Sequence, residues 1–297
     1  METNISVVGS IALDTLETPK GNQNDILGGS ATYFAIAASK FSPVEVIGIV
    51  GSDFPQHGWD VFNRNNINHE NIIRAEGQTF RWGGKYNEDY SSRDTLFTDL
   101  GVFEHFIPQI KNTSNENGIL FLANIHPSLQ LDVLNKMSDD ISLVVADTMN
   151  LWIDVDLKGL HEVIEKSNIF LLNDEEAVQL TKISDLELSG KKILDMGPKT
   201  VIIKMGSKGS LLISSGCVTK IPCVPNIDVY DPTGAGDSFA GGLIGYISKY
   251  GEKNMVEALL YASSVASFTV SDFGINKILN LNLKDIESRV EILRTMI

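Results

Sequence analysis

The chain has 297 residues, of which 43% are hydrophobic, and its 24 basic and 38 acidic residues give a formal net charge of −14. This composition supports a large core and excludes disorder, and the acidic balance argues against a nucleic-acid partner. No apolar run reaches the roughly 20 residues of a membrane span, and the N-terminal residues lack the basic region of a signal peptide. We therefore expect a cytoplasmic protein in which Cys217 and Cys223 are reduced.

The first fifth of the chain predicts strands and one helix. Residues 5–9 form an apolar run that ends in glycine, as a buried strand would. Asp14 follows it and is compatible either with a solvated turn or with a binding role. Gly28 and Gly29 precede small and apolar residues, which predicts a glycine turn into a helix. A second strand is predicted over residues 44–51.

Two segments then interrupt the alternation of strands and helices. Residues 79–86 and 95–98 mix aromatic and charged side chains and are joined by a polar stretch, which predicts a small β-flap. Arg81 and Arg93 lie in this flap. From the residues alone, contact with a substrate and a solvated flap surface fit these arginines equally well.

The alternation is regular from residue 118 onward. Three apolar runs predict strands covered by helices on both faces, namely 118–124, 141–147 and 169–173. They end in Asn124, Asp147 and Asn173, and in a doubly wound sheet such carboxyl ends border the ligand crevice. Each residue alone is a weak signal because Asn and Asp also favour turns.

Two later segments have ordinary structural explanations as well as functional ones. Asn173 and Glu176 have the spacing of a helix capping box. Residues 200–213 predict a strand, a turn at Gly206 and Gly209, and a second strand. The phosphate-loop pattern G-x-x-x-x-G-K-[ST] is absent from the sequence, which excludes a P-loop kinase.

The most informative stretch is residues 231–242, DPTGAGDSFAGG. Gly234 and Gly236 let the main chain approach a ligand closely, and helical spacing of apolar residues predicts a helix that starts at or just before Asp237. The free amides and dipole of such a helix start bind anions. A carboxylate at an anion site suggests a base beside a phosphoryl group, although a first-turn Asp can also simply complement the helix dipole.

This stretch resembles the anion-hole signature of the ribokinase-like (PfkB) carbohydrate kinases, D-[TP]-T-G-A-G-D-x-F-x-G-G. The Gly-Gly turn, the N-x-x-E segment and the glycine hairpin occur in the family's order, so the resemblance covers nearly the whole chain. It implies a single α/β domain over residues 1–297, with a doubly wound, mostly parallel sheet covered by helices on both faces. It also implies a small β lid from segments near 12–26 and 78–100. The expected reaction is transfer of a phosphoryl group from ATP to a hydroxymethyl group of a sugar.

The resemblance also implies residue roles. Asp237 would be the catalytic base, and the amides of Gly234, Ala235 and Gly236 would bind the transferring phosphoryl group. The implied ATP-binding residues are Lys204, Gly206, Gly209, Thr233, Gly234 and Gly236. The implied acceptor-binding residues are Asp14, Gly28, Gly29, Arg81, Asn124 and Asp237. Asn173 and Glu176 would help to hold Mg²⁺, which favours a few protein oxygens together with phosphates and water.

One position departs from the family pattern and keeps the acceptor open. Many sugar kinases of the family carry Asn four residues after the second glycine of the Gly-Gly turn, where this chain has Tyr33. A nucleoside kinase of the same family is the main alternative, because a base could stack on aromatic residues here: Tyr33, Phe34, Phe80, Trp82 and Tyr86. A non-catalytic sugar or nucleotide sensor is a second alternative, and the intact Asp237 argues against it. A monovalent-cation requirement and a homodimer are left open.

Overall fold

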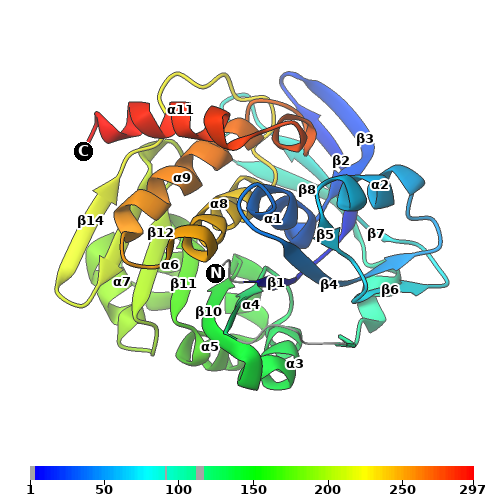
Figure 1. Ribbon diagram of the computed structural model, residues 1–297, viewed down its shortest axis with the longest axis horizontal. Helices are drawn as coiled ribbons and strands as arrows, with labels where there is room; N and C mark the ends of the chain where they lie inside the picture. The colour runs from blue at the N-terminus through cyan, green and yellow to red at the C-terminus, as the bar shows by residue number, and fades with distance from the viewer. Residues whose placement is uncertain (1–3, 91, 112–116) are drawn as a thin grey trace.

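The structure is a computed structural model that describes residues 4–90, 92–111 and 117–297 (Figure 1). Within these residues the main sheet has ten strands: β1 (Ile5–Val8), β4 (Val44–Gly51), β5 (Ile67–Asn68), β6 (Ile72–Ala75), β9 (Gly118–Leu122), β10 (Ile141–Asp147), β11 (Ile169–Asn173), β12 (Thr200–Lys204), β13 (Ser210–Ser214) and β14 (Cys217–Ile221). Their order is β14-β13-β12-β11-β10-β9-β1-β4-β5, with β6 paired to β4. Every pairing is parallel except β12–β13 and β13–β14. The mostly parallel sheet is as predicted.

Helices cover both faces of this sheet, as Figure 1 shows. One face packs against α1 (Ser30–Ala38), α2 (Gln56–Arg64), α8 (Ala235–Tyr250), α9 (Met255–Thr269), α10 (Asn276–Leu279) and α11 (Leu283–Arg294). The opposite face packs against α3 (Pro127–Met137), α4 (Asn150–Val155), α5 (Leu157–Lys166), α6 (Asp174–Thr181) and α7 (Leu186–Leu194). The doubly wound arrangement that the apolar runs predict is confirmed.

The strands divide their side chains between two hydrophobic cores. In β9, Ile119 and Phe121 face the core under α1 and α8, whereas Leu120 and Leu122 face the core on the other side. This follows from the two-residue period of a strand, and because both faces are covered, every residue of β9 is apolar or glycine. All five residues of β9 are buried, so the sequence run reads as continuously hydrophobic.

A second sheet of four strands stands apart from the main one. It contains β2 (Ala12–Thr18), β3 (Gly21–Gly28), β7 (Phe80–Tyr86) and β8 (Arg93–Asp99), in the order β3-β2-β7-β8. The flap predicted at 79–86 and 95–98 corresponds to β7 and β8. Asp14 lies inside β2 rather than in a turn, because the chain leaves the main sheet after Val8 and begins the second sheet at Ala12.

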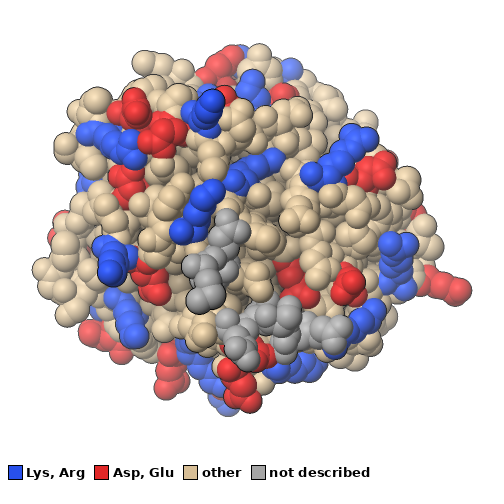
Figure 2. Space-filling view, in the orientation of Figure 1, with Lys and Arg blue, Asp and Glu red and all other residues tan. Residues whose placement is uncertain are grey.

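The surface carries charges of both signs. On the face shown in Figure 2, Lys and Arg side chains lie interspersed with Asp and Glu, so that no extended basic area forms on that face. Among the described residues, none of the helices combines the length and the apolar composition that crossing a membrane requires. Cys217 and Cys223 are both free thiols.

Candidate active site

The carboxyl ends of β10 and β12 are joined by an ion pair. Lys204 Nζ donates to Asp147 Oδ2 at 2.6 Å, across the intervening β11, and the two side chains are only 17% and 5% exposed. Burial lowers the pKa of Lys204, but the charges of Asp147 and Glu176 outweigh burial, and the net shift of this pKa is upward. The lysine is therefore a fixed cation at this edge of the sheet.

The predicted capping box at the start of α6 is confirmed. Asn173 Oδ1 accepts from the Glu176 amide at 2.8 Å, and Glu176 Oε2 accepts from the Asn173 amide at 2.7 Å. Burial raises the pKa of Glu176 to about 7, with the charge of Lys204 opposing the rise. Near neutral pH this carboxyl group is about half ionised, so its charge responds readily to a nearby cation.

The glycine-rich loop enters α8 as the sequence predicts. The helix begins at Ala235, two residues before Asp237. Gly234 is the N-cap, with φ 72° in the left-handed region, and a Cβ on it would lie 2.3 Å from ring carbons of Tyr33. The first hydrogen bond of the helix joins Ser238 N to Gly234 O at 2.8 Å. The Ala235 amide already donates to Pro232 O at 3.2 Å, so the other amides before Ser238 form the open helix start that can hold an anion.

Asp237 and Lys204 meet at this helix start. A Cβ on Gly236 would lie 3.3 Å from Lys204 Nζ, so the ammonium group faces the first turn of α8. Asp237 is half-buried, and burial together with the charge of Asp147 raises its pKa to about 6. The charges of Lys204 and Arg93 oppose this rise. Asp237 is thus mostly ionised at pH 7 and close to the pKa range of an effective general base.

A second group of acidic residues lies beside the second sheet. Asp14 is 3% exposed, and its carboxylate occupies the space next to Gly28, where a Cβ would lie 1.9 Å from Asp14 Oδ2. Burial, followed by the charges of Asp231 and Asp237, raises the pKa of Asp14 to about 8. The Gly29 amide donates to this carboxyl group and lowers the pKa in part. The structure thus brings Asp14, Gly28, Gly29 and Asp237 together.

Three further polar residues belong to this area. Sequence reasoning named Tyr33 and Tyr86 only as rings on which a nucleoside base could stack, and it gave Asp231 no acceptor role. Asp231 is fully buried and accepts from the amides of Thr233 and Gly274, both at 2.9 Å. The hydroxyl of Tyr86, on β7, lies 2.8 Å from Thr233 Oγ1 and links the second sheet to the loop. The hydroxyl of Tyr33 is buried among these groups. These contacts join residues that are far apart in sequence. Asp231, the first residue of the glycine-rich stretch, was the only local signal for them.

Other predicted site residues have partners of their own. Asn124 accepts from Trp152 Nε1 at 2.7 Å and donates to Met149 Sδ at 3.2 Å. Arg81 forms an ion pair with Asp53 at 2.9 Å and lies 3.7 Å from Asp25.

The glycine hairpin after β12 also has a structural explanation. Gly209 has φ 90°, and a Cβ on it would lie 2.0 Å from Ile221 O, so the hairpin itself requires glycine there. Gly206 has φ 54° and no atom within 4 Å of a Cβ position, so the turn is open on that side.

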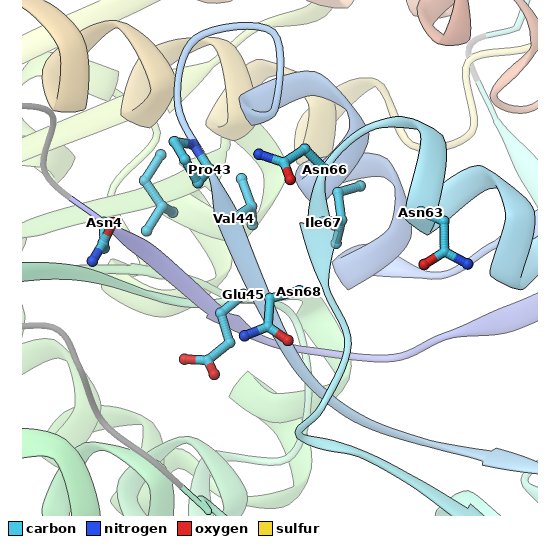
Figure 3. Close-up of a pocket in the computed structure, with 9 residues that line it drawn as sticks. Asn4, Pro43, Val44, Glu45, Asn63, Asn66, Ile67 and Asn68 are labelled. Carbon is cyan, nitrogen blue, oxygen red and sulfur yellow. The ribbon is translucent and has the colours of Figure 1, made fainter.

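Figure 3 shows a hollow at the opposite end of the main sheet. It has a volume of about 280 Å³ and lies at the amino ends of β1, β4 and β5. It is lined by Asn4, Ile5, Pro43, Val44, Glu45, Asn63, Asn66, Ile67 and Asn68. None of these residues was predicted to bind a ligand, and the candidate site is defined instead by the convergence of Asp237, Lys204 and Asp14 at the carboxyl ends.

Comparison with known proteins bears directly on this arrangement. The profile of the pfkB family carbohydrate kinases matches residues 3–280. The chain belongs to the PfkB family of carbohydrate kinases. The fold is accordingly ribokinase-like, as the sequence resemblance implied, and the protein is a phosphotransferase that acts on a hydroxyl group of a sugar or nucleoside.

Individual members of the PfkB family resemble the chain over most of its length. The cytidine kinase of Thermococcus kodakarensis is 28% identical over 249 residues, which are 81% of this chain and 87% of that protein. A 1-phosphofructokinase of Haemophilus influenzae is 27% identical over 82% of this chain and 79% of its own length. The crystal structure of the Methanocaldococcus jannaschii nucleoside kinase superimposes with a TM-score of 0.80, at 25% identity, over 98% of this chain and 99% of that one.

Proposed function

We propose that the protein transfers the γ-phosphoryl group of ATP to a hydroxymethyl group of a sugar or nucleoside. The observation that carries this proposal is Asp237 in the first turn of α8, beside the ammonium group of Lys204. Asp237 accepts the proton of the attacking hydroxyl group, and the amides at the helix start together with Lys204 hold the phosphoryl oxygens. Positioning and charge stabilisation supply most of the rate in such transfers.

A nucleoside acceptor has specific support. A relative that matches over most of the chain is named cytidine kinase, and the structural neighbour is named nucleoside kinase. The expected stacking platform is smaller than the sequence suggests, because Phe34 stacks on Phe121 in the core and Phe80 stacks on Phe103. Of the other three aromatic residues named for this role, Tyr33 and Tyr86 are buried, and Trp82 is half-buried, with the Arg93 guanidinium 5.1 Å from its ring centroid.

The donor set near α6 fits Mg²⁺. Among the described residues no group of three or more metal-binding side chains comes together, so a closed protein cage is not formed there. Mg²⁺ needs no such cage, because it keeps several waters and is shared with the phosphates of ATP. Glu176 offers a buried carboxyl group beside Asn173, and a bound cation would keep this group ionised. Mg²⁺ neutralises phosphate charge when bound.

Other parts of the assignment stay predictions. ATP contacts at Gly206, Gly209 and Thr233, acceptor contacts at Arg81 and Asn124, and a monovalent cation follow from the family resemblance alone. The cytoplasmic location expected from the sequence and a homodimer are predictions in the same sense. We expect Asn124 and Arg81 to act by positioning, since each is already held by a neighbouring side chain.

The second sheet is the proposed lid over the acceptor. It is tied to the loop before α8 by the contact of Tyr86 with Thr233 and by the hydroxyl of Tyr90, which donates to Tyr230 O at 3.3 Å. Closure on a filled site would strengthen such contacts. We expect β7 and β8 to gain hydrogen-exchange protection when cytidine and a non-hydrolysable ATP analogue are added together. Unchanged exchange in both strands would count against a lid.

An assay of ATP-dependent phosphorylation tests the function. The purified protein is incubated with ATP, Mg²⁺ and a panel of ribose, fructose, cytidine, inosine and adenosine. Turnover with a sugar or a nucleoside identifies the acceptor class. Binding of a panel compound without turnover would favour the sensor alternative, and neither binding nor turnover would contradict the proposed function.

A further inference from the structure

Tyr33 carries a buried hydroxyl group with no partner in the described part of the chain. The residue lies on α1, one helical turn after Gly29, and is 1% exposed. Its ring packs against Gly234, and its hydroxyl makes no hydrogen bond. An unpaired buried hydroxyl destabilises the free protein by roughly 1–3 kcal/mol. Such a group is therefore best explained by a partner that arrives from outside the chain.

The hydroxyl lies in the part of the candidate site formed by Asp14, Tyr33 and Asp231, which we call the acceptor side. Burial, followed by the charges of Asp231 and Asp14, raises its pKa well above 10, and the charge of Asp237 acts on it as well. It is therefore protonated at neutral pH and is available as a hydrogen-bond donor. Tyr86, the neighbouring phenol, differs because its hydroxyl is already engaged with Thr233 Oγ1.

The charges around Tyr33 restrict the ligand further. Asp14, Asp231 and Asp237 all act electrostatically on this one hydroxyl. Lys204, the basic group at the start of α8, is already paired with Asp147. The charge of Arg93 reaches Asp14 but offsets only part of the effect of burial and of the other carboxylates on its pKa. Asp14 is mostly protonated at pH 7, but Asp237 is mostly ionised, so an anionic group placed beside Tyr33 would meet repulsion from Asp237.

We propose that Tyr33 selects the acceptor: its hydroxyl donates a hydrogen bond to a hydroxyl group of an uncharged sugar or nucleoside held between Asp14 and Asp237. Phosphorylated sugars are disfavoured at this position by the negative charge of Asp237. The ring of Tyr33 also fills the space over Gly234, which fixes how close the acceptor comes to the helix start. This inference rests on the proposed kinase function and names the chemical class of its acceptor.

The test is Tyr33→Phe, which removes only the hydroxyl group. The probe is cytidine or ribose, whichever the wild-type protein phosphorylates with the higher kcat/KM. The kcat/KM for fructose 1-phosphate, a charged sugar, is measured for comparison. We expect KM for the probe to rise about five- to tenfold, the effect of one lost hydrogen bond, with kcat and KM for ATP unchanged within about twofold. The thermal midpoint of the free protein should stay the same or rise, because an unpaired buried polar group is removed.

Thr32→Val is the matched control. Thr32 is the neighbouring residue on α1, is fully buried and also has an unpaired hydroxyl, but it is not part of the acceptor side. This variant should change the thermal midpoint in the same direction as Tyr33→Phe and leave the KM of the probe unchanged. A KM effect equal to that of Tyr33→Phe would show that α1 as a whole, and not the Tyr33 hydroxyl, sets acceptor affinity.

Three outcomes overturn the proposal or its basis in different ways. An unchanged acceptor KM in Tyr33→Phe overturns the proposal whatever the thermal midpoint does, and a lower midpoint would in addition give Tyr33 a structural role. A kcat/KM for fructose 1-phosphate above that of both uncharged probes contradicts the charge selection. If the wild-type protein turns over none of the panel compounds and no fructose 1-phosphate, the kinase function itself is contradicted. Normal turnover with an unaltered KM in Tyr33→Phe contradicts only the role of Tyr33.

Discussion

The two sides of the candidate site differ in how their polar groups are paired before a ligand binds. On the phosphoryl side, formed by Asp147, Lys204, Glu176 and the first turn of α8, a 2.6 Å ion pair and a complete capping box are already in place. On the acceptor side, formed by Asp14, Tyr33 and Asp231, the two carboxyl groups accept from backbone amides, and the Tyr33 hydroxyl is unpaired. The polar groups of the first side are therefore fixed in advance by an ion pair and a capping box, whereas the second side keeps a buried hydroxyl that has no partner.

This difference has a physical consequence for recognition. A pre-arranged set of charges stabilises a developing transition state without reorganisation, which suits the part of the ligand that reacts. A buried polar group that lacks a partner discriminates strongly among ligands. A ligand that cannot form a hydrogen bond with it leaves the group unpaired, and the complex then carries the free-energy penalty of that unpaired group. We infer that the phosphoryl side supplies rate and the acceptor side supplies selectivity, and the predictions below test that division.

The largest expected effect is on the phosphoryl side. Asp237→Asn keeps the shape of the side chain but cannot accept a proton, and a general base contributes about 10²–10⁴-fold to rate. We expect kcat to fall by about that factor, while ATP affinity stays equal or increases because a negative charge beside the phosphates is removed. The measurements are steady-state turnover and ATP affinity on one preparation.

The thermal midpoint of the same preparation serves as the control for this variant. Burial raises the pKa of Asp237 to about 6, so its ionised form is destabilised in the folded protein, and replacement by Asn should not reduce stability at pH 7. Near-normal turnover per folded molecule would remove the base assignment and leave only an anion site at the helix start.

A smaller effect is expected for Glu176→Gln. The amide side chain can still accept the hydrogen bond from the Asn173 amide that closes the capping box, so the helix start should keep its stability. What is lost is the charge that we propose helps to hold Mg²⁺. We expect the Mg²⁺ concentration for half-maximal rate to rise about tenfold, measured by titration at saturating ATP. A lower thermal midpoint with an unchanged Mg²⁺ titration would leave Glu176 with a capping role only.

The two sides also differ in how well the sequence predicts them. The strands that end in Asp147, Asn173 and Lys204 are continuous apolar runs, and the loop before α8 has a distinctive glycine pattern, so the phosphoryl side follows from local signals. In β3 the four residues from Asn22 to Asp25 are all exposed, so its sequence is typical of a polar loop. Its pairing with β2, which places Gly28 against Asp14, therefore has no local signal.

The contact of Tyr33 with Gly234 illustrates the same limit. Each residue is interpretable alone, one as an unusual aromatic in a small-residue helix and the other as a turn glycine. Their contact depends on how α1 packs against α8 across the core, which is a property of the tertiary fold. Sequence reasoning therefore named Asp14, Gly28, Gly29 and Tyr33 one by one, but it could not predict the contacts that they make in the fold.

The smallest expected effect concerns the stability of the free protein through Asp14. The folded-state pKa of this residue is about 8, above its ordinary value of 3.8, so between these pH values the folded protein binds more protons than the unfolded chain. Its contribution to stability is fully present below about pH 4 and is lost as the pH rises through about 8. Asp14→Asn removes this dependence while nearly keeping the shape that fits against Gly28.

Urea unfolding of the wild type and of Asp14→Asn at pH 5, 7 and 9 measures this contribution. We expect the free energy of unfolding of the variant, relative to the wild type, to increase by about 1–3 kcal/mol between pH 5 and pH 9, the cost of a buried charge that lacks a full partner. A relative stability that is the same at all three pH values would show that the Asp14 carboxylate is already satisfied in the free protein. The acceptor side would then be as fully paired as the phosphoryl side, and the division between rate and selectivity would lose its physical basis.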